Sequence, residues 1–424
     1  MFDQGNHAVL KRDGVCVVLK TPVNDMPQVE YWGQDFGISQ DEMLLAQLDT
    51  MTLKVTPPQE KPDAALRPSL LPQGAEAFAG RPGLEAYRGT KPVFVRWTSV
   101  STSIASEGTE GYGTSITITA EDAVNEVRLE LVLALQHGGL ILIKQTVTNL
   151  SANSEPLTIN WLESTLPTPK RVDTLTQFTG RWPLEKQARS TALPSGSITR
   201  ECRHGKTSHE SPWMFIATNG EPKWSEGEVW ACHLAWSGNQ TYRIDNLPTH
   251  EPLIGAGELL GPGEIQLAGG EHYTTPEVCF SYSDEGLDGM AARFHTWLRG
   301  TPGCVDPAVK PRPFTLNTWE AVYFDHDEAT LKKLADRAAE VGVERFVLDD
   351  GWFHLRRDDT KGLGDWVVDP AVWPNGLDGL DRTRAQARHG IRPLVRTRNG
   401  EPRLRLRPRT SRLDPRRARS RALP

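Results

Sequence analysis

Cysteine is scarce in this 424-residue sequence, and its spacing excludes two common kinds of site. The five cysteines are odd in number and far apart: Cys16, Cys202, Cys232, Cys279 and Cys304. Zinc centres and CxxC redox motifs need cysteine, or cysteine with histidine, at short spacings, and the sequence contains no such spacing. We therefore expect reduced, mostly buried thiols.

Long apolar runs are also missing. The first residues, "MFDQGNHAVLKRDG", have neither the basic start nor the apolar core of a secretory signal, and no later run reaches about eighteen apolar residues. These absences predict a cytoplasmic protein that does not enter a membrane.

Positive charge is scarce except at the end of the chain. Residues 392–424 contain twelve arginines against Glu401 and Asp414, a balance of +10, while the whole chain carries −6 and the remainder therefore −16. An arginine-rich tail on an acidic body suggests a nucleic-acid-binding arm. A defect in the sequence is the alternative hypothesis.

The residue in excess is tryptophan, which occurs 13 times. Its flat ring stacks well on the C–H face of a sugar, although most tryptophans in proteins belong to the core.

From residue 5 to about 305 the pattern indicates strands. Short β-branched or alternating runs are separated by turn-forming stretches such as "EDAVNE", "QHGG" and "SANSEP". The runs include "GVCVVLK", "SITITA", "VRLELVLAL", "GLILIKQTVTNL" and "LTINWLE". Many strands with short turns predict a large antiparallel β-sandwich over residues 1–305.

The spacing of apolar residues changes from that of strands to that of a helix after the proline-rich linker "VDPAVKPRP". The stretch "DEATLKKLADRAAEVG", residues 327–342, has a helical apolar spacing and lies between two strand-like runs, "FTLNTWEAVYF" and "VERFVLDD". A further helix is expected in "GLDGLDRTRAQARHG" and a third strand in "IRPLV". This β-α-β order predicts the beginning of a (β/α)₈ barrel over residues 306–393, incomplete because a whole barrel needs about 250 residues.

Asp349 and Asp350 follow the second of these strands. In a parallel α/β fold, ligands bind at the carboxyl ends of the strands. Neighbouring strand residues point to opposite faces, so this pair does not easily flank a scissile bond as acid and nucleophile. Past the strand end, beside Gly351, both carboxylates can converge on the hydroxyls of one sugar. The alternative is a solvated strand end without a function.

Trp319 lies near the end of the first barrel strand, beside the acids in a barrel. It is a candidate face for the C–H side of a sugar, or else a core ring.

At this point the sequence resembles the bacterial α-galactosidases of glycoside hydrolase family 36, from about residue 10 to about 393. The ordered block from Phe346 to Leu377 carries most of the resemblance. The matching stretches are "LNTWEAVYF", "FVLDDGWF", "RRDD", "GLGDWVVDPAVWPNGL", and upstream "GRW", "GKTSHESPW", "HLAWSGN" and "FHTWLR".

The resemblance implies a β-supersandwich, a (β/α)₈ catalytic barrel and a small C-terminal β-domain. It implies retaining hydrolysis of terminal α-D-galactosyl groups, as in melibiose and raffinose, without a cofactor or metal. The residues that match Trp319, Asp349 and Asp350 line the galactose site in that family, and the acids bind ring hydroxyls. Intact relatives are often homo-oligomers. Galactosyl transfer, as in raffinose-synthase relatives, stays open because the loops that select the acceptor are missing.

The catalytic carboxylates of the resembled family have no counterpart here. Its nucleophile lies in a "KWD" motif on the fourth barrel strand and its acid/base on a later strand, and neither motif occurs in this sequence. We therefore expect no hydrolysis from the chain as written. A non-catalytic galactoside-binding fragment is the alternative function.

A frameshift explains the arginine-rich end. The family continues with "WFEPEMVNPDSD" where this sequence has "LVRTRNGEPRLRLRP" from Leu394. The permitted codons CTG-GTT-CGA-ACC-CGA-AAT-GGT encode Leu394 to Gly400, and the same bases read one position later encode W-F-E-P-E-M-V. We therefore expect residues 394–424 to be out of frame and disordered, with no nucleic-acid partner.

Overall fold

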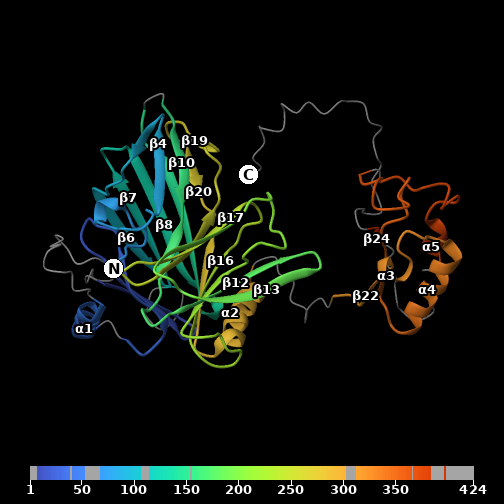
Figure 1. Ribbon diagram of the computed structural model, residues 1–424, viewed down its shortest axis with the longest axis horizontal. Coiled ribbons are helices and arrows are strands. Elements are labelled where there is room, and N and C mark those ends of the chain that lie inside the picture. Colours follow the sequence, from blue (N-terminus) through green and yellow to red (C-terminus); the bar gives the residue numbers. More distant parts are fainter. Residues whose placement is uncertain are drawn as a thin grey trace. The chain divides into compact units, whose positions relative to one another are not determined.

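The computed structural model describes residues 7–38, 41–52, 67–106, 114–152, 155–301, 312–364, 366–382 and 396–397. The chain divides into two compact units, residues 1–304 and 305–424, and each is described by itself (Figure 1).

Unit 1 is built from antiparallel strands in four sheets, as the sequence predicts for a large β-sandwich. The first sheet contains β1 (His7–Arg12), β2 (Val15–Lys20) and β3 (Gln28–Gln34), in that order. The second has the order β19-β10-β4-β5, with β19 (Ile265–Leu267), β10 (Leu157–Leu162), β4 (Leu84–Arg88) and β5 (Lys91–Val93).

The third sheet has the order β11-β18-β17-β14, with β11 (Ser164–Pro167), β18 (Leu253–Glu258), β17 (Gln240–Asn246) and β14 (Gly196–Cys202). The fourth has the order β13-β12-β15-β16-β21-β9-β8-β7-β6, and β20 pairs with β9. Its strands are β6 (Ser99–Ala105), β7 (Ser115–Asp122), β8 (Val127–Gln136), β9 (Leu140–Asn149), β12 (Thr174–Arg181), β13 (Leu184–Ala192), β15 (Phe215–Thr218), β16 (Val229–Leu234), β20 (His272–Thr274) and β21 (Val278–Ser283).

The core of unit 1 lies between these sheets because their strands alternate. On β8, Val127, Leu129 and Leu131 are buried while Arg128 and Glu130 are exposed, which is the period of two expected for a strand with one face in the core. The same hydrophobic cluster contains Leu10 of β1, Ile159 of β10, Tyr242 of β17 and Phe280 of β21.

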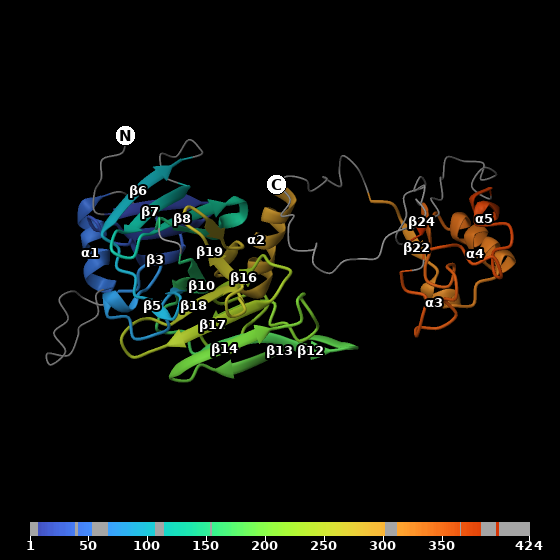
Figure 2. The same ribbon diagram turned by 90° about the horizontal axis from the view of Figure 1, so that it is seen from above.

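Two helices of unit 1 cover sheet faces that the main core leaves open. Helix α1 (Glu42–Thr52) places Leu45 against Val9, Cys16 and Val18 of the first sheet, so both faces of that sheet are covered (Figure 2). Helix α2 (Gly286–Gly300) is labelled in Figure 1, and its Met290 packs against residues of β15 and β16. Two 3₁₀ turns, Gly74–Glu76 and His137–Gly139, complete the unit.

Unit 2 begins the expected parallel α/β pattern. Its sheet has the order β22-β23-β24, with β22 (Thr315–Asn317), β23 (Arg345–Leu348) and β24 (Arg396–Thr397), and both pairings are parallel. Its helices are α3 (Trp319–Val322), α4 (Glu328–Glu340) and α5 (Asp378–Arg382). Helix α4 confirms the prediction from its apolar spacing. The side chain of Asp327 caps it by accepting the backbone N–H of Thr330 at 2.8 Å.

The structure corrects one prediction in unit 2. The run "FTLNTWEAVYF" predicts a strand with Trp319 at its end, but β22 ends at Asn317 and Trp319 begins α3. The reason is local hydrogen bonding, because the side chain of Asn317 accepts the Trp319 N–H at 2.8 Å and the carbonyl of Thr318 accepts the Ala321 N–H at 3.0 Å.

Several predictions fall outside the described residues. These are most of the linker "VDPAVKPRP", the second half of the helix expected at 376–390, the strand expected at "IRPLV", and the tail from residue 394 except β24.

Candidate functional site

The candidate site lies at the carboxyl edge of the sheet in unit 2. Strands β22 and β23 run parallel with Asn317 opposite Val347, so the residues that follow both strands gather at one edge. Asn317, Thr318 and Trp319 come from the first strand end, and Asp349 and Asp350 from the second.

Asp349 is held in place by the neighbouring strand end. Its side chain is buried, and Oδ2 accepts a hydrogen bond from Asn317 Nδ2 at 2.7 Å. Its backbone N–H donates to Oγ1 of Thr318 at 3.1 Å, and Thr318 is itself fully buried. These two contacts restrict the carboxylate to one orientation at the end of β23.

Asp350 takes a different partner. Its Oδ2 accepts hydrogen bonds from Arg356 Nε at 3.2 Å and Nη2 at 2.9 Å, while its backbone N–H donates to Asp349 Oδ1 at 2.9 Å. Within the described residues, Oδ1 of Asp350 has no hydrogen-bond partner. This oxygen can accept a hydrogen bond from a ligand.

Contacts other than the ion pair with Asp350 hold the Arg356 side chain in place. Its side chain is only 6% exposed, Nη1 donates to the carbonyl of Lys361 at 3.0 Å, and the guanidinium lies 5.2 Å from the ring centre of Phe324. Because these contacts already order the guanidinium, the ion pair fixes the orientation of the Asp350 carboxylate.

The residue after the acids must be glycine. Gly351 has φ = +105°, and a Cβ there would lie 2.9 Å from two ring atoms of His326. The absence of a side chain lets the chain turn away from the strand directly behind the carboxylates. Burial, followed by the charge of Arg357, lowers the pKa of His326 to about 4, so this packed ring is neutral at pH 7.

Trp319 belongs to a group of aromatic rings at the same edge. Its indole is half-buried, and its ring centre lies 5.2 Å from that of Tyr323 and 5.0 Å from that of Phe324, both nearly perpendicular. Because Asn317 accepts the Trp319 N–H and donates to Asp349, one side chain connects two of the three residues singled out in the sequence.

Sequence reasoning missed Asn317, Thr318 and Arg356. The first two follow β22 just as the acids follow β23, so the strand-end rule could have found them. The pairing of Arg356 with Asp350 left no comparable signal, because the conformation of the loop decides which arginine of "RRDD" turns inward.

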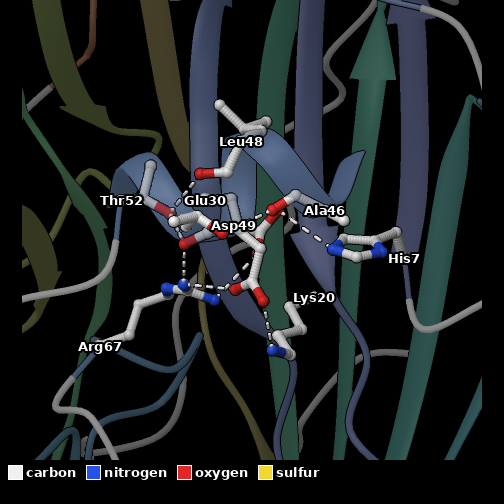
Figure 3. Close-up of polar contacts among 9 residues, drawn as sticks. His7, Lys20, Glu30, Ala46, Leu48, Asp49, Thr52 and Arg67 are labelled. Atoms are coloured by element: carbon white, nitrogen blue, oxygen red, sulfur yellow. Dashed lines mark hydrogen bonds and ion pairs between the residues drawn. The ribbon is translucent and has the colours of Figure 1, made fainter. Parts of the chain in front are cut away.

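A second polar cluster lies in unit 1, where no functional residue was expected. Arg67 donates to Glu30 Oε1 at 2.9 Å and to Asp49 Oδ1 at 2.6 Å, and Lys20 donates to Asp49 Oδ2 at 2.7 Å (Figure 3). His7 Nε2 lies 3.4 Å from Glu30 Oε2. The cluster joins β1, β2, β3 and α1 to the segment at Arg67, and so holds α1 on the first sheet.

The structure describes four of the cysteines, Cys16, Cys202, Cys232 and Cys279. All four are buried and none of them forms a disulfide, while Cys304 lies outside the described residues. In the described part of the chain, His, Cys, Asp and Glu side chains form no group of three or more that could hold a metal ion. None of the helices described is both long and apolar enough to span a bilayer.

Two family models match consecutive parts of the chain. The glycosyl hydrolase family 36 N-terminal domain matches residues 25–268, more than half of the chain, and the melibiase model matches residues 272–391. The chain belongs to glycosyl hydrolase family 36. The two matches together cover most of each unit.

Curated family 36 relatives are similar along much of this chain. An α-galactosidase of Escherichia coli is 36% identical over 313 residues, which are 73% of this chain and 42% of that protein. The α-galactosidase AgaA of Geobacillus stearothermophilus is 37% identical over 207 residues, which are 47% of this chain and 28% of that protein. The chain therefore spans less than half the length of either relative.

Solved family 36 structures share the fold. The crystal structure of AgaA superposes with a TM-score of 0.73 at 25% identity, over 89% of this chain and 54% of that one. The structure of AgaB from the same organism has a TM-score of 0.75 at 24% identity, over 92% of this chain and 55% of that one. The antiparallel β-domain followed by the start of a parallel α/β region is thus the expected family 36 architecture.

Proposed function

We propose that Trp319, Asp349 and Asp350 seat a terminal galactosyl group, and that the protein derives from an α-galactosidase. The observation that carries the proposal is the hydrogen-bonded connection from the Trp319 backbone through Asn317 to the buried Asp349 carboxylate. It sets an aromatic ring and oriented carboxylates at one edge, which is the combination a pyranose needs for its C–H face and its hydroxyls.

The substrate class follows from the relatives. Similar proteins are named α-galactosidases, and AgaA variants from Geobacillus stearothermophilus have been solved in complex with raffinose and with stachyose. We propose retaining hydrolysis of terminal α-D-galactosyl residues by double displacement as the ancestral reaction. That reaction needs two carboxyl groups about 5–5.5 Å apart, one as nucleophile and one as acid/base.

Asp349 and Asp350 do not take these catalytic roles in our proposal. Asp349 is tied to Asn317, and Asp350 is tied to Arg356, so each carboxylate already holds a structural partner on one side. The 424 residues contain no "KWD" stretch for the nucleophile. The chain as written therefore binds galactosides and does not hydrolyse them.

A frameshift shortly before Leu394 is part of this proposal. The melibiase match ends at residue 391, and the arginine-rich stretch follows directly. Resequencing the codons from Asn375 to Pro424 tests it, because a corrected reading frame should encode "WFEPEM" and, further on, "KWD". An unchanged sequence would identify the chain as the product of a damaged gene.

Calorimetry tests the binding function directly. Galactose titrated into the purified 424-residue chain should release heat, and Asp349→Asn should remove most of it, because the amide cannot accept at both positions as the carboxylate does. Asp336→Asn, an exposed residue on α4, is the matched control and should bind like the wild type. Heat that survives Asp349→Asn unchanged would show that galactose binds elsewhere.

An aryl α-galactoside provides the second assay. The chain as written should leave it intact, and the product of a corrected reading frame should cleave it. Hydrolysis by the 424-residue chain at ordinary enzyme rates would overturn the proposal. A cytoplasmic location and an oligomeric assembly stay predictions from the sequence and the resemblance.

A further inference from the structure

A recess in unit 1 is lined by charged side chains that have unused hydrogen-bonding atoms. It holds about 250 Å³ of empty space, open solvent included. Its lining includes Pro72, Phe78, Glu163, Thr165, Arg243 and Leu253. All of these belong to residues 1–304, the first of the two units.

The strand register explains why the space exists. In the third sheet Gly255 of β18 is paired with Thr165 of β11 on one side and with Arg243 of β17 on the other. A Cβ on Gly255 would lie 2.5 Å from Thr165 Cγ2 and 3.2 Å from Glu163 Oε1. The glycine therefore leaves room in front of the Glu163 carboxylate that any other residue would occupy.

Glu163 and Arg243 both present unpaired polar atoms to this space. Their side chains are 2% and 6% exposed, and Glu163 Oε2 lies 3.7 Å from Arg243 Nη1, too far for a direct hydrogen bond. In the described part of the chain, Glu163 Oε1, Arg243 Nη1 and Thr165 Oγ1 have no hydrogen-bond partner. Unpaired polar atoms at this depth are costly, so the site is suited to a group that satisfies them.

The charges of the side chains around the recess determine which chemical group of a ligand fits there. Asp245 already accepts from Arg243 Nε at 2.8 Å and also from Nη2, which leaves only Nη1 to donate. An anion entering the recess would meet the carboxylates of Glu163 and Asp245, and a cation would meet the guanidinium groups of Arg243 and Arg81. A hydroxyl group is neutral, donates to a carboxylate and accepts from a guanidinium, so it matches both partners at once.

The walls favour a hydroxyl carried by a carbon ring. Phe78, Pro72 and Leu253 supply apolar surface beside the polar end, and Phe78 is stacked on His250 with ring centres 5.0 Å apart. A second recess of about 280 Å³ shares Pro72 and Phe78 with the first. The combination of apolar walls and convergent polar groups is typical of sites for small polyhydroxylated ligands.

We propose that this recess is a carbohydrate-binding site, in which a sugar hydroxyl fills the gap between Glu163 and Arg243 and the sugar's C–H face lies on Phe78. The ligand class is a neutral mono- or oligosaccharide. The proposal does not rest on the function proposed for unit 2.

The test uses the full chain with Asp349→Asn, so that the candidate site in unit 2 is silenced. Galactose, glucose and raffinose are titrated by calorimetry, and raffinose is also followed by saturation-transfer NMR. We expect binding that weakens about tenfold on Glu163→Gln and on Thr165→Val, because each change removes a hydrogen bond to the ligand. Thr119→Val, at a half-buried position on β7, is the matched control and should bind like its parent.

The outcomes separate the two proposals. No sugar binding in the Asp349→Asn chain, or binding that both recess variants leave unchanged, overturns this inference. A crystal soaked with raffinose that shows only an ordered water between Glu163 and Arg243 does the same. Binding that is lost in the recess variants but is insensitive to Asp349→Asn supports the recess and counts against the function proposed for unit 2. Thermal unfolding shows whether each variant is folded. If Glu163→Gln does not fold, the result for Thr165→Val, at a partly exposed position, decides the test.

Discussion

Each unit contains a pair of acidic side chains with an arginine, and the two pairs are built in opposite ways. Glu30 and Asp49 are distant in sequence, and Arg67 contacts both of them. Asp349 and Asp350 are adjacent, and Arg356 contacts Asp350 through its side chain. The first pair connects separate elements, whereas the second is presented at a strand end by its own loop.

The difference lies in the partners of the acids and not in their burial. The Glu30 carboxylate is completely buried, with Arg67 2.9 Å from Oε1 and His7 3.4 Å from Oε2, and Asp49 is 20% exposed. Asp350 is 18% exposed and keeps one oxygen without a partner in the described residues. Glu30 and Asp49, called the enclosed pair below, share Arg67 between separate elements. In the pair after β23, called the open pair, Asp349 is buried and Asp350 offers an oxygen to a ligand.

The largest expected effect comes from removing the arginine of the enclosed pair. Arg67→Met leaves Glu30 and Asp49 facing each other without their shared cation, and should lower the free energy of unfolding of unit 1 by about 3–5 kcal/mol. Urea denaturation followed by circular dichroism measures it. Arg128→Met, which breaks the exposed pair with Glu121, is the control and should cost less than about 1 kcal/mol. Equal losses would mean that the cluster does not fasten α1.

The second effect is a dependence of stability on pH that comes from Glu30. Burial, and then a hydrogen bond to Asp49, raises the pKa of Glu30 from 4.5 to about 7. Its folded-state pKa is above its unfolded value, so its contribution to stability is complete below pH 4.5 and is lost as the pH rises through 7.

Glu30→Gln removes this titration while the surrounding His7, Lys20, Asp49 and Arg67 stay. The stability of the wild type minus that of the variant should fall by up to about 3 kcal/mol as the pH rises from 4.5 to 7. Urea denaturation of both proteins across this range measures the difference. A difference that is constant with pH would show that Glu30 is ionised in the folded protein throughout.

The arginine of the open pair should matter less for stability and more for binding. Arg356→Met removes two hydrogen bonds to Asp350 and should destabilise unit 2 by about 1.5–3 kcal/mol. It should also weaken galactose binding, because Asp350 is no longer oriented. Hydrogen exchange of residues 345–364 and calorimetry measure the two effects. The exposed Arg337→Met is the control, and a galactose affinity unchanged by Arg356→Met would contradict the orienting role.

The smallest expected effect is the difference in stability between alanine substitutions at two glycines of unit 2. Gly351 and Gly364 have φ of +105° and +95°, but only at Gly351 does a Cβ meet neighbouring atoms within 4 Å. Alanine at either position should cost about 1 kcal/mol of backbone strain, and Gly351→Ala about 1–2 kcal/mol more from the contact with His326. Thermal unfolding monitored by hydrogen exchange in unit 2 measures both. Equal losses would show that the loop relaxes around the added methyl group.

The local pattern of the sequence was sufficient for most elements. The alternation of Val127, Leu129 and Leu131 predicted β8, and the apolar spacing after Asp327 predicted α4. The ends of strands were predicted less well. Asn317 ends β22 through a side-chain hydrogen bond, which the alternation of apolar and polar residues does not reveal. The placement of Asp349 and Asp350 after β23 was predicted correctly, since the strand-end rule depends only on the order of elements.

The sequence by itself determined the two-part organisation, the kind of sheet in each part and the resemblance to family 36, because short-range periodicity and ordered motifs are properties of neighbouring residues. Only the tertiary structure decided which distant side chains meet: Arg67 with Glu30 and Asp49, Asn317 with Asp349, and Glu163 with Arg243 across the space that Gly255 leaves. The reason is physical, because such contacts depend on strand register and loop closure over long separations, and neither is written in any local stretch of the chain.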